Sequence, residues 1–407
     1  MKFDTLAAPV RIGSRTAPNR IVNHPMECND ADADGNPTDL TRRRYLKLAK
    51  GGAGIINVES LTISALSRAR KNQLQITEKN AEQLARLVRE MKTVNPDSLI
   101  IFQINHSGNV SGDFSEVVSY YPTYYPLDSP KVRILTDADI EEIKGWFVRA
   151  AVIAHQAGAD GIDFKQCHGY LGGQLLRPAN TKAGRYGGSF QNRTRFFRET
   201  AQEMKTAIGD KKFLLSTRIS VYEGIPGGFG TAGPDEVAED LSEPLAFCRM
   251  IEEAGFHFIN VSGGIPVMTA EITRPTKNYP AGIYRQFGWA KAVRSAVRLP
   301  LIGSAYSYLK NGKNRLPGDD TEKKSLLYWA EKNIRDDKID MIGVGRQSLA
   351  DPLFAKKVLF GEVDKINFCT TCGGCSTLLK SQALVGCTVY SKFYKDELRR
   401  VRKEKKR

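Results

Sequence analysis

Short apolar runs alternate with longer amphipathic segments from about residue 18 to residue 355. The short runs are rich in β-branched residues and predict eight strands: Ile21–Met26, Gly54–Ser60, Ser98–Ile104, Gly161–Lys165, Phe213–Ile219, Phe258–Ser262, Leu299–Ser304 and Met341–Gly345. The longer segments predict helices such as Ala81–Met91, Asp137–Ala157, Arg193–Ile208, Pro234–Ala254 and Glu322–Asp336. Eight strand–helix alternations favour an α/β fold of the (β/α)8-barrel (TIM barrel) type over a doubly wound sheet.

Four of these predicted strands carry polar residues at or near their ends, namely Glu59, Gln103, Lys165 and Arg218. A barrel of this kind places its site at the carboxyl ends of the strands. Any one of these side chains could be a hydrogen-bonded residue of the rim. Taken together, they favour a site at this end of the barrel.

The barrel repeat stops after Asp351-Pro352, where the chain becomes rich in Cys and Gly. We therefore expect a barrel over residues 1–360, a small appended segment over 361–390 and a basic tail over 391–407. Part of the net charge of +15 lies in that tail. No known nucleic-acid motif accompanies it, so nucleic-acid binding is not expected, and the positive field suits an anionic cofactor or an acidic redox partner.

A chain of 407 residues that is 41% hydrophobic can bury a large core. The N-terminal sequence has no apolar signal region, and no run of about 18 apolar residues occurs. These features predict a cytoplasmic protein without a membrane span. Homo-oligomerisation is left open.

One motif carries candidate chemistry at the end of the fourth predicted strand. Lys165, His168 and Tyr170 follow the spacing K-x-x-H-x-Y. Two neighbouring donors can hold a carbonyl oxygen and stabilise the negative charge that develops on it. A phenol two residues further along can deliver a proton.

The C-terminal cysteines form a second motif. Cys369, Cys372, Cys375 and Cys387 read C-x2-C-x2-C-x11-C. Four thiolates can bind a cubane iron–sulfur cluster or a structural zinc ion. Three bunched cysteines with one apart favour the cluster, because zinc ribbons usually pair two C-x2-C knuckles. The isolated Cys167 and Cys248 are expected to be core thiols.

The sequence resembles the Old Yellow Enzyme family, and within it the 2,4-dienoyl-CoA reductase-like branch that carries an iron–sulfur cluster. The most specific element is the block at the fourth strand, which ends in R-Y-G-G-S-x-x-N-R at Arg185–Arg193. The supporting stretches are Asn19–Met26, Gly51–Glu59, Gln103–Gly108 and Gly343–Arg346. Their order and spacing along one chain carry the resemblance, which covers nearly all of residues 1–390.

The resemblance implies FMN at the barrel mouth. Pro25, Met26 and the following Glu27 would back the flavin ring, and Ser60 and Gln103 would bind its pyrimidine edge. Arg218 would lie near the flavin N1 and O2 atoms. The phosphate would be held by four residues of the last two strands and their turns: Gly303, Ser304, Gly345 and Arg346. Glycine turns at this position form the phosphate site common in such barrels, and a guanidinium matches phosphate geometry.

In the family's pattern, His168 is one of a pair of carbonyl-binding residues and Tyr170 is the proton donor. Lys165 occupies the position that usually holds the second histidine; it can bind the carbonyl or turn towards an acidic neighbour. Glu27 stands where relatives commonly have Cys or Thr near flavin N5. The cysteine motif has one residue fewer between its second and third cysteines than that branch.

The expected function is that of an ene-reductase, which reduces the C=C bond of an enone, enoate or enoyl thioester with FMN and a 4Fe-4S cluster. The chain ends at Arg407 without a G-x-G-x-x-G in a βαβ setting, so we expect an external donor: a ferredoxin, a flavodoxin or a flavin reductase. Tyrosines in the 112–133 loop suggest a steroid-like or aryl substrate, while exposed tyrosines also serve oligomer interfaces; they are Tyr120, Tyr121, Tyr124 and Tyr125. The alternatives are an amine dehydrogenase, a dehydrogenase working in the reverse direction, and a non-catalytic electron-transfer subunit.

Overall fold

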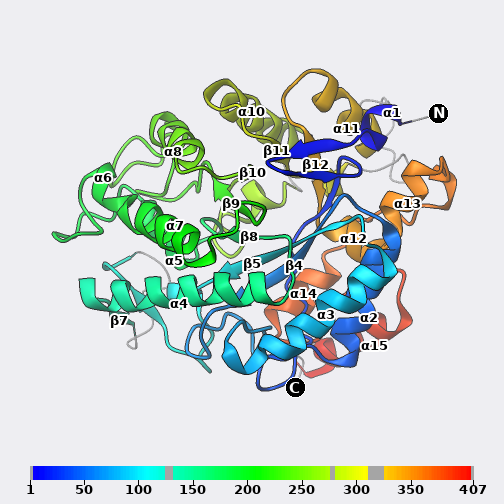
Figure 1. The fold of residues 1–407 in the computed structure, drawn as a ribbon, viewed down its shortest axis with the longest axis horizontal. Helices are drawn as coiled ribbons and strands as arrows, with labels where there is room; N and C mark the ends of the chain where they lie inside the picture. Colours follow the sequence, from blue (N-terminus) through cyan, green and yellow to red (C-terminus); the bar gives the residue numbers. More distant parts are fainter. Residues whose placement is uncertain (1–2, 124–131, 276–279, 310–324, 405–407) are drawn as a thin grey trace.

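The computed structural model describes residues 3–123, 132–275, 280–309 and 325–404. Its centre is a closed barrel of eight parallel strands with helices around it (Figure 1). In barrel order the strands are β3 (Ile21–Asn23), β4 (Ile55–Thr62), β5 (Leu99–Asn105), β8 (Gly161–Phe164), β9 (Leu214–Ser220), β10 (Phe258–Ser262), β11 (Leu301–Gly303) and β12 (Met341–Val344). The predicted TIM barrel is confirmed, and each of the eight predicted strands overlaps one of these.

The connections between the strands contain the outer helices. These are α2 (Asp39–Gly51), α3 (Ala81–Val94), α4 (Asp137–Gln156), α7 (Arg195–Ile208), α8 (Ser242–Glu253), α10 (Ala281–Ala296) and α11 (Leu326–Arg335). Shorter helices are α1 (Asp4–Ala7), α5 (Leu171–Leu176), α6 (Phe190–Arg193), α9 (Ala270–Thr273), α12 (Arg346–Ala350) and α13 (Phe354–Leu359). Two short strands, β6 (Val118–Ser119) and β7 (Arg133–Ile134), pair with each other outside the barrel.

Local signals explain where several helices begin and end. Thr38 and Thr136 form capping boxes at the starts of α2 and α4. Gly52, with φ 70°, and Gly209, with φ 65°, end α2 and α7 in the left-handed conformation that glycine adopts without strain. Such ends let the chain turn directly back into the next strand.

Two helix predictions need correction. Residues 234–241, expected to be helical, form a loop, because the Asp240 backbone N–H bonds to the Gly230 carbonyl and the Asp240 side chain accepts from the Ser242 N–H. The last outer helix begins at Leu326, after the Ser325 cap. Positions 322–324 of that prediction lie outside the described residues.

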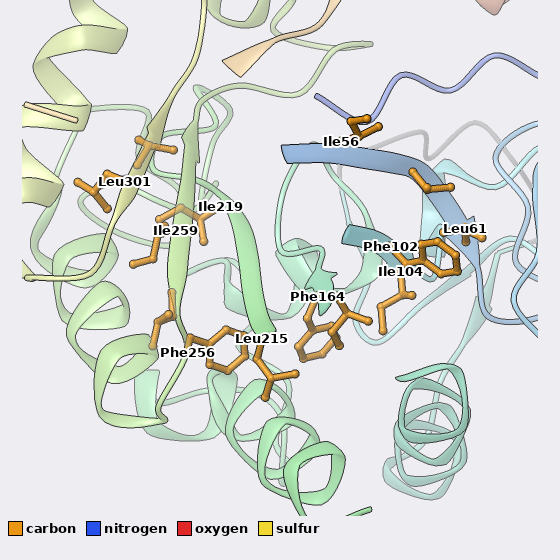
Figure 2. Close-up of a cluster of buried hydrophobic side chains, with 14 of the residues drawn as sticks. Ile56, Leu61, Phe102, Ile104, Phe164, Leu215, Ile219, Phe256, Ile259 and Leu301 are labelled. Carbon is orange, nitrogen blue, oxygen red and sulfur yellow. The ribbon is translucent and has the colours of Figure 1, made fainter. Parts of the chain in front are cut away.

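Hydrophobic side chains fill the space between the barrel and its helices. Figure 2 shows part of this layer, with Phe102 and Phe164 among the buried residues. A separate cluster fills the amino-terminal end of the barrel, where the hairpin of β1 (Val10–Ile12) and β2 (Arg15–Ala17) contributes Val10, Ile12 and Ala17. The hairpin closes this end, so the opposite end is the one available for a site.

The C-terminal segment packs on the barrel beside α2 (Figure 1). It contains α14 (Gly374–Lys380) and α15 (Lys392–Glu404). Leu378, Leu398 and Val401 form a small buried cluster with Cys28, which follows β3. The part of the predicted basic tail that is described is thus a packed amphipathic helix; residues 405–407 lie outside the description.

No helix among the described residues is long and apolar enough to cross a membrane.

Candidate active site

A cavity of about 240 Å³ opens at the carboxyl ends of the barrel strands. Most of the predicted site residues line it: Pro25, Met26, Glu27, Gln103, Lys165, His168, Tyr170, Arg218, Ser304, Gly345, Arg346 and Cys375. The fold therefore brings together residues as far apart in the sequence as Pro25 and Cys375. Ser60 and Gly303 do not line the cavity themselves; Gly303 ends β11 directly before Ser304.

Glu59 does not line the cavity, contrary to the expectation that it contributes to the site. Successive side chains of a strand point to opposite faces. Ser60 points to the barrel mouth, where it contacts Lys165, while Glu59 points outward to Arg44 of α2. For Glu59, the interpretation as a hydrogen-bonded residue of the rim is the correct one.

The ammonium group of Lys165 is directed at a carboxylate within the protein. Lys165 Nζ donates to Ser60 Oγ at 2.8 Å and to Glu27 Oε1 at 3.4 Å. It also lies 3.2 Å from the centroid of the Tyr170 ring. Of the two orientations that the sequence allowed for Lys165, the structure has the one in which the lysine points to an acidic neighbour, Glu27.

Glu27 is the acceptor at the centre of this group. Its carboxylate accepts hydrogen bonds from the Tyr170 hydroxyl and, at 2.8 Å, from Arg70 Nε. Burial alone would raise the pKa of Glu27, but the charges of Arg70 and Lys165 outweigh it and lower the pKa to about 2. The carboxylate is therefore ionised at neutral pH.

His168 also lines the cavity, and its backbone has the left-handed φ of 63°, which is a strained conformation for a residue other than glycine. Its backbone N–H donates to Ser220 Oγ at 3.1 Å, and Ser262 Oγ lies 3.5 Å from its Nε2. Burial and the positive charges of Arg218 and Lys165 lower the pKa of His168 well below its usual value. The ring is neutral, and one of its two nitrogens carries a proton that can be donated.

Arg218 offers the clearest fit to a bound anion. Its guanidinium lines the cavity, its Nη2 lies 3.4 Å from Ser304 Oγ, and its Nε is buried without a protein partner. A buried unpaired donor on a cation is costly unless a ligand satisfies it. The position suits the electron-rich edge of a flavin, as the sequence resemblance implies.

Three of the predicted phosphate residues line the same cavity as Arg218, at the carboxyl ends of β11 and β12: Ser304, Gly345 and Arg346. A Cβ added to Gly345 would come within 2.8 Å of Met26 Sδ, so this position accepts no larger side chain without movement. The Arg346 guanidinium lies 3.9 Å from the centroid of the Tyr308 ring. Arg346 and Cys375 line the same cavity, and burial lowers the pKa of Arg346 while the nearby cysteines oppose this shift.

The four C-terminal cysteines are free thiols, and Cys372 is the most exposed of them. Burial raises the pKa of Cys369 and of Cys375, the neighbouring thiols raise it further, and the charge of Arg346 opposes them. Four cysteines are the type of donor that binds a cubane cluster, and of the four only Cys375 lines the cavity. Within the described part of the chain, no group of three or more Cys, His, Asp or Glu side chains is arranged to hold a metal ion.

The sequence did not point to several residues that line the cavity. Arg70 and Arg274 belong to loops after β4 and β10, and His24 and Tyr308 lie beside the predicted flavin and phosphate residues. The only feature of the sequence that could have predicted a place for these two arginines in the site is that each belongs to a segment that follows a barrel strand. Tyr120 and Tyr121 of the predicted substrate loop are buried, whereas Tyr124 and Tyr125 lie outside the described residues.

The barrel and the residues at its mouth are those that the sequence resemblance predicts for a flavin-binding protein. Residues 5–364 match the model of the NADH:flavin oxidoreductase / NADH oxidase family, and the chain belongs to this family. The expectation of an Old Yellow Enzyme-type protein with FMN as its flavin is thereby confirmed.

Three relatives illustrate the match. The chain is 31% identical over 384 residues to an NADH oxidase of Thermoanaerobacter brockii, covering 92% of this chain and 54% of that protein. It is 26% identical over 421 residues to a cinnamate reductase of Clostridium sporogenes, covering 95% and 58%. A solved structure of 2-naphthoyl-CoA reductase with 2-naphthoyl-CoA superposes with a TM-score of 0.80 at 22% identity, covering 97% and 58%. The chain thus spans a little over half the length of these proteins.

Proposed function

We propose that the protein is an FMN- and 4Fe-4S-dependent ene-reductase that reduces the C=C bond of an α,β-unsaturated carbonyl compound. The observation that carries the proposal is the placement of His168 and Tyr170 in one cavity with Arg218. A neutral donor for a carbonyl oxygen and a phenol for proton delivery are the two groups that this reaction needs besides the flavin.

FMN would be held by the cavity residues named above, and when bound it supplies the hydride for the β-carbon. His168 would donate a hydrogen bond to the substrate carbonyl. Tyr170 would transfer its hydroxyl proton to the α-carbon, so that an O–H bond breaks and a C–H bond forms. The ammonium of Lys165, against the Tyr170 ring, would stabilise the phenolate left behind until solvent returns the proton.

Cys369, Cys372, Cys375 and Cys387 would hold the 4Fe-4S cluster, which supplies electrons one at a time. The donor set supports this proposal, as does the place of Cys375 in the cavity lining. Residues 361–390 would then form the cluster segment appended to the barrel. Electrons would come from an acidic carrier such as a ferredoxin or flavodoxin, or from a flavin reductase, since the net charge of +15 attracts acidic partners.

One observation favours a second candidate, a dehydrogenase that works in the reverse direction. The Lys165 ammonium lies 3.2 Å from the centroid of the Tyr170 ring, and a phenolate that it stabilises can accept a proton from a C–H bond of a saturated substrate. The direction of turnover therefore has to be measured.

The test is anaerobic purification with iron, sulfide and flavin quantified, followed by turnover of an alkene panel with reduced methyl viologen. Enones, enoates and enoyl thioesters form the panel. A saturated carbonyl compound and a tertiary amine, each supplied with an oxidised dye as electron acceptor in place of reduced methyl viologen, form the oxidation arms. We expect alkene reduction, and we expect Tyr170→Phe to lower kcat by about 10²–10⁴-fold. Zinc at the thiolates without flavin, or an unchanged kcat in Tyr170→Phe, would refute the proposal; fast turnover with NADPH alone would refute the external donor.

A further inference from the structure

The two positions at which the active-site sequence departs from its family's pattern contact each other. Lys165, in place of the usual histidine, donates to Glu27, in place of the usual Cys or Thr, at 3.4 Å. The residues are 138 positions apart in the chain. A single feature, a buried ion pair at the barrel mouth, accounts for both departures.

Arg70 completes this group, which we call the Glu27 network: Glu27, Arg70, Lys165 and Tyr170. Arg70 Nε and Lys165 Nζ bond to different carboxylate oxygens of Glu27, leaving an excess of one positive charge. The side chains of Lys165, Glu27 and Arg70 are 4%, 11% and 20% exposed, so their interactions are little screened by water. The carboxylate is held by the protein and is not free to approach the flavin as an unpaired charge.

The network restrains Tyr170 from two sides. Its hydroxyl donates a charge-assisted hydrogen bond to Glu27 Oε1, the same oxygen that Lys165 approaches. The Lys165 ammonium meanwhile lies on the ring at 3.2 Å from its centroid. Ser60 Oγ fixes the lysine at 2.8 Å, and Asn105 Nδ2 donates to Ser60 Oγ at 2.9 Å. Each member therefore has its place set by another member or by the strands.

We propose that Glu27 is a positioning residue that holds the phenol of Tyr170 for proton transfer, and that Lys165 serves this network while His168 binds the substrate carbonyl. The inference rests on the proposed function and assigns new roles to Glu27 and Lys165. The ring and oxygen of Tyr170 are already placed before substrate arrives, which removes part of the entropic cost of the proton transfer. The hydroxyl hydrogen then turns from Glu27 to the α-carbon as it is transferred.

The network also sets the acidity of the phenol. Burial raises the pKa of Tyr170 well above its usual value, Glu27 raises it further, and the charge of Arg70 opposes them. Replacing Glu27 by the neutral Gln removes a negative charge and leaves Arg70 and Lys165 unpaired beside the phenol. The phenol of that variant must be more acidic.

The experiment titrates Tyr170 in the oxidised holoenzyme by ultraviolet difference absorbance. Subtracting the curve of Tyr170→Phe from that of wild type isolates one tyrosine among 15. Subtracting Glu27→Gln/Tyr170→Phe from Glu27→Gln does the same for the variant. We expect Glu27→Gln to increase the acid dissociation constant of Tyr170 at least about tenfold, one pKa unit. A Tyr170 that titrates no lower in Glu27→Gln than in wild type would overturn the proposal.

Kinetics supply the second measurement. In Glu27→Gln we expect kcat for alkene reduction to fall about tenfold with KM nearly unchanged, as for a residue that acts through another. Glu27→Asp should recover part of kcat, and Lys165→Met combined with Glu27→Gln should lose less than the product of the two single effects. A Lys165→Met variant that raised KM alone would assign the lysine to the carbonyl and refute this part of the proposal.

A matched control is Glu331→Gln. Glu331 is a buried carboxylate that accepts from the Leu6 N–H at 2.9 Å and does not line the cavity. It should change neither the titration of Tyr170 nor kcat. The two proposals fail separately: wild type that reduces no alkene refutes the proposed function, while the titration of Tyr170 tests the network whether or not a substrate is known.

Discussion

Glu27 follows β3 and Glu59 lies in the neighbouring strand β4, yet the charges around the two carboxylates differ. Glu27 has two cations, Arg70 and Lys165, and its pKa is about 2. Glu59 shares the single cation Arg44 with a second buried carboxylate, Asp30. Burial raises the pKa of Glu59 to about 7, because the charge of Arg44 does not compensate for burial and for Asp30.

This difference separates a carboxylate suited to chemistry from one suited to structure. The Glu27 network lines the cavity and contacts a candidate proton donor. Glu59 faces outward, where it accepts from the Cys28 N–H at 2.6 Å, and its own N–H donates to the Tyr45 hydroxyl. It thereby ties α2 to the loop after β3. Perturbing the first group should affect activity most, and perturbing the second should affect stability most.

The largest expected effect is that of Arg44→Met. It leaves Asp30 and Glu59 buried without their cation, and removing one partner of a buried ion pair costs about 3–5 kcal/mol of folding free energy. Urea unfolding should show this loss, while kcat of the folded enzyme stays close to that of wild type. In a Glu59→Gln background the same substitution should cost less, since one buried charge is already gone. Equal costs in both backgrounds would show that Arg44 and Glu59 are not coupled.

Sequence patterns could predict the barrel and most of its lining because both follow from local regularities. Strand periodicity fixed the carboxyl ends, and the K-x-x-H-x-Y spacing placed Lys165, His168 and Tyr170 at one of them. The cysteine cluster motif lies within 19 residues and is equally local.

The charge pairing could not be predicted in the same way. The partner of Glu27 could have been any cation at the mouth, and Arg70 comes from a loop eight residues beyond the last residue of β4. Whether Lys165 points to substrate or to Glu27 depends on side-chain packing across the barrel. Glu59 and Ser60 are neighbours in sequence, and only the strand register decides which of them faces the mouth.

Arg70→Met should have the next largest effect, and this effect should be on the Glu27 network and therefore on activity. Arg70 is the largest of the influences that lower the pKa of Glu27, so its loss raises that pKa from about 2 towards the ordinary value. We expect the acid limb of the kcat–pH profile to move to higher pH and kcat at neutral pH to fall about tenfold. The free energy of unfolding should fall by about 1.5–3 kcal/mol, because a charged hydrogen bond is lost. Arg70→Lys, which keeps the charge, should restore most of the profile. An acid limb at the wild-type pH in Arg70→Met would show that Arg70 does not control Glu27.

The smallest expected effect is in the pH dependence of stability, where the two carboxylates should act in opposite directions. The native state raises the pKa of Glu59 from 4.5 to about 7, so it binds the proton more tightly than the unfolded chain does. Stability from this group is present below pH 4.5 and is lost as the pH rises to about 7, with a slope below about 1.4 kcal/mol per pH unit. For Glu27 the native pKa is lowered from 4.5 to about 2, so its contribution is present above pH 4.5 and is lost as the pH falls towards 2.

Urea unfolding at a series of pH values should therefore show that Glu59→Gln flattens the curve between pH 4.5 and 7, whereas Glu27→Gln leaves that interval unchanged. If both variants changed the same interval, the two carboxylates would belong to one titrating system, and the distinction between them would fail.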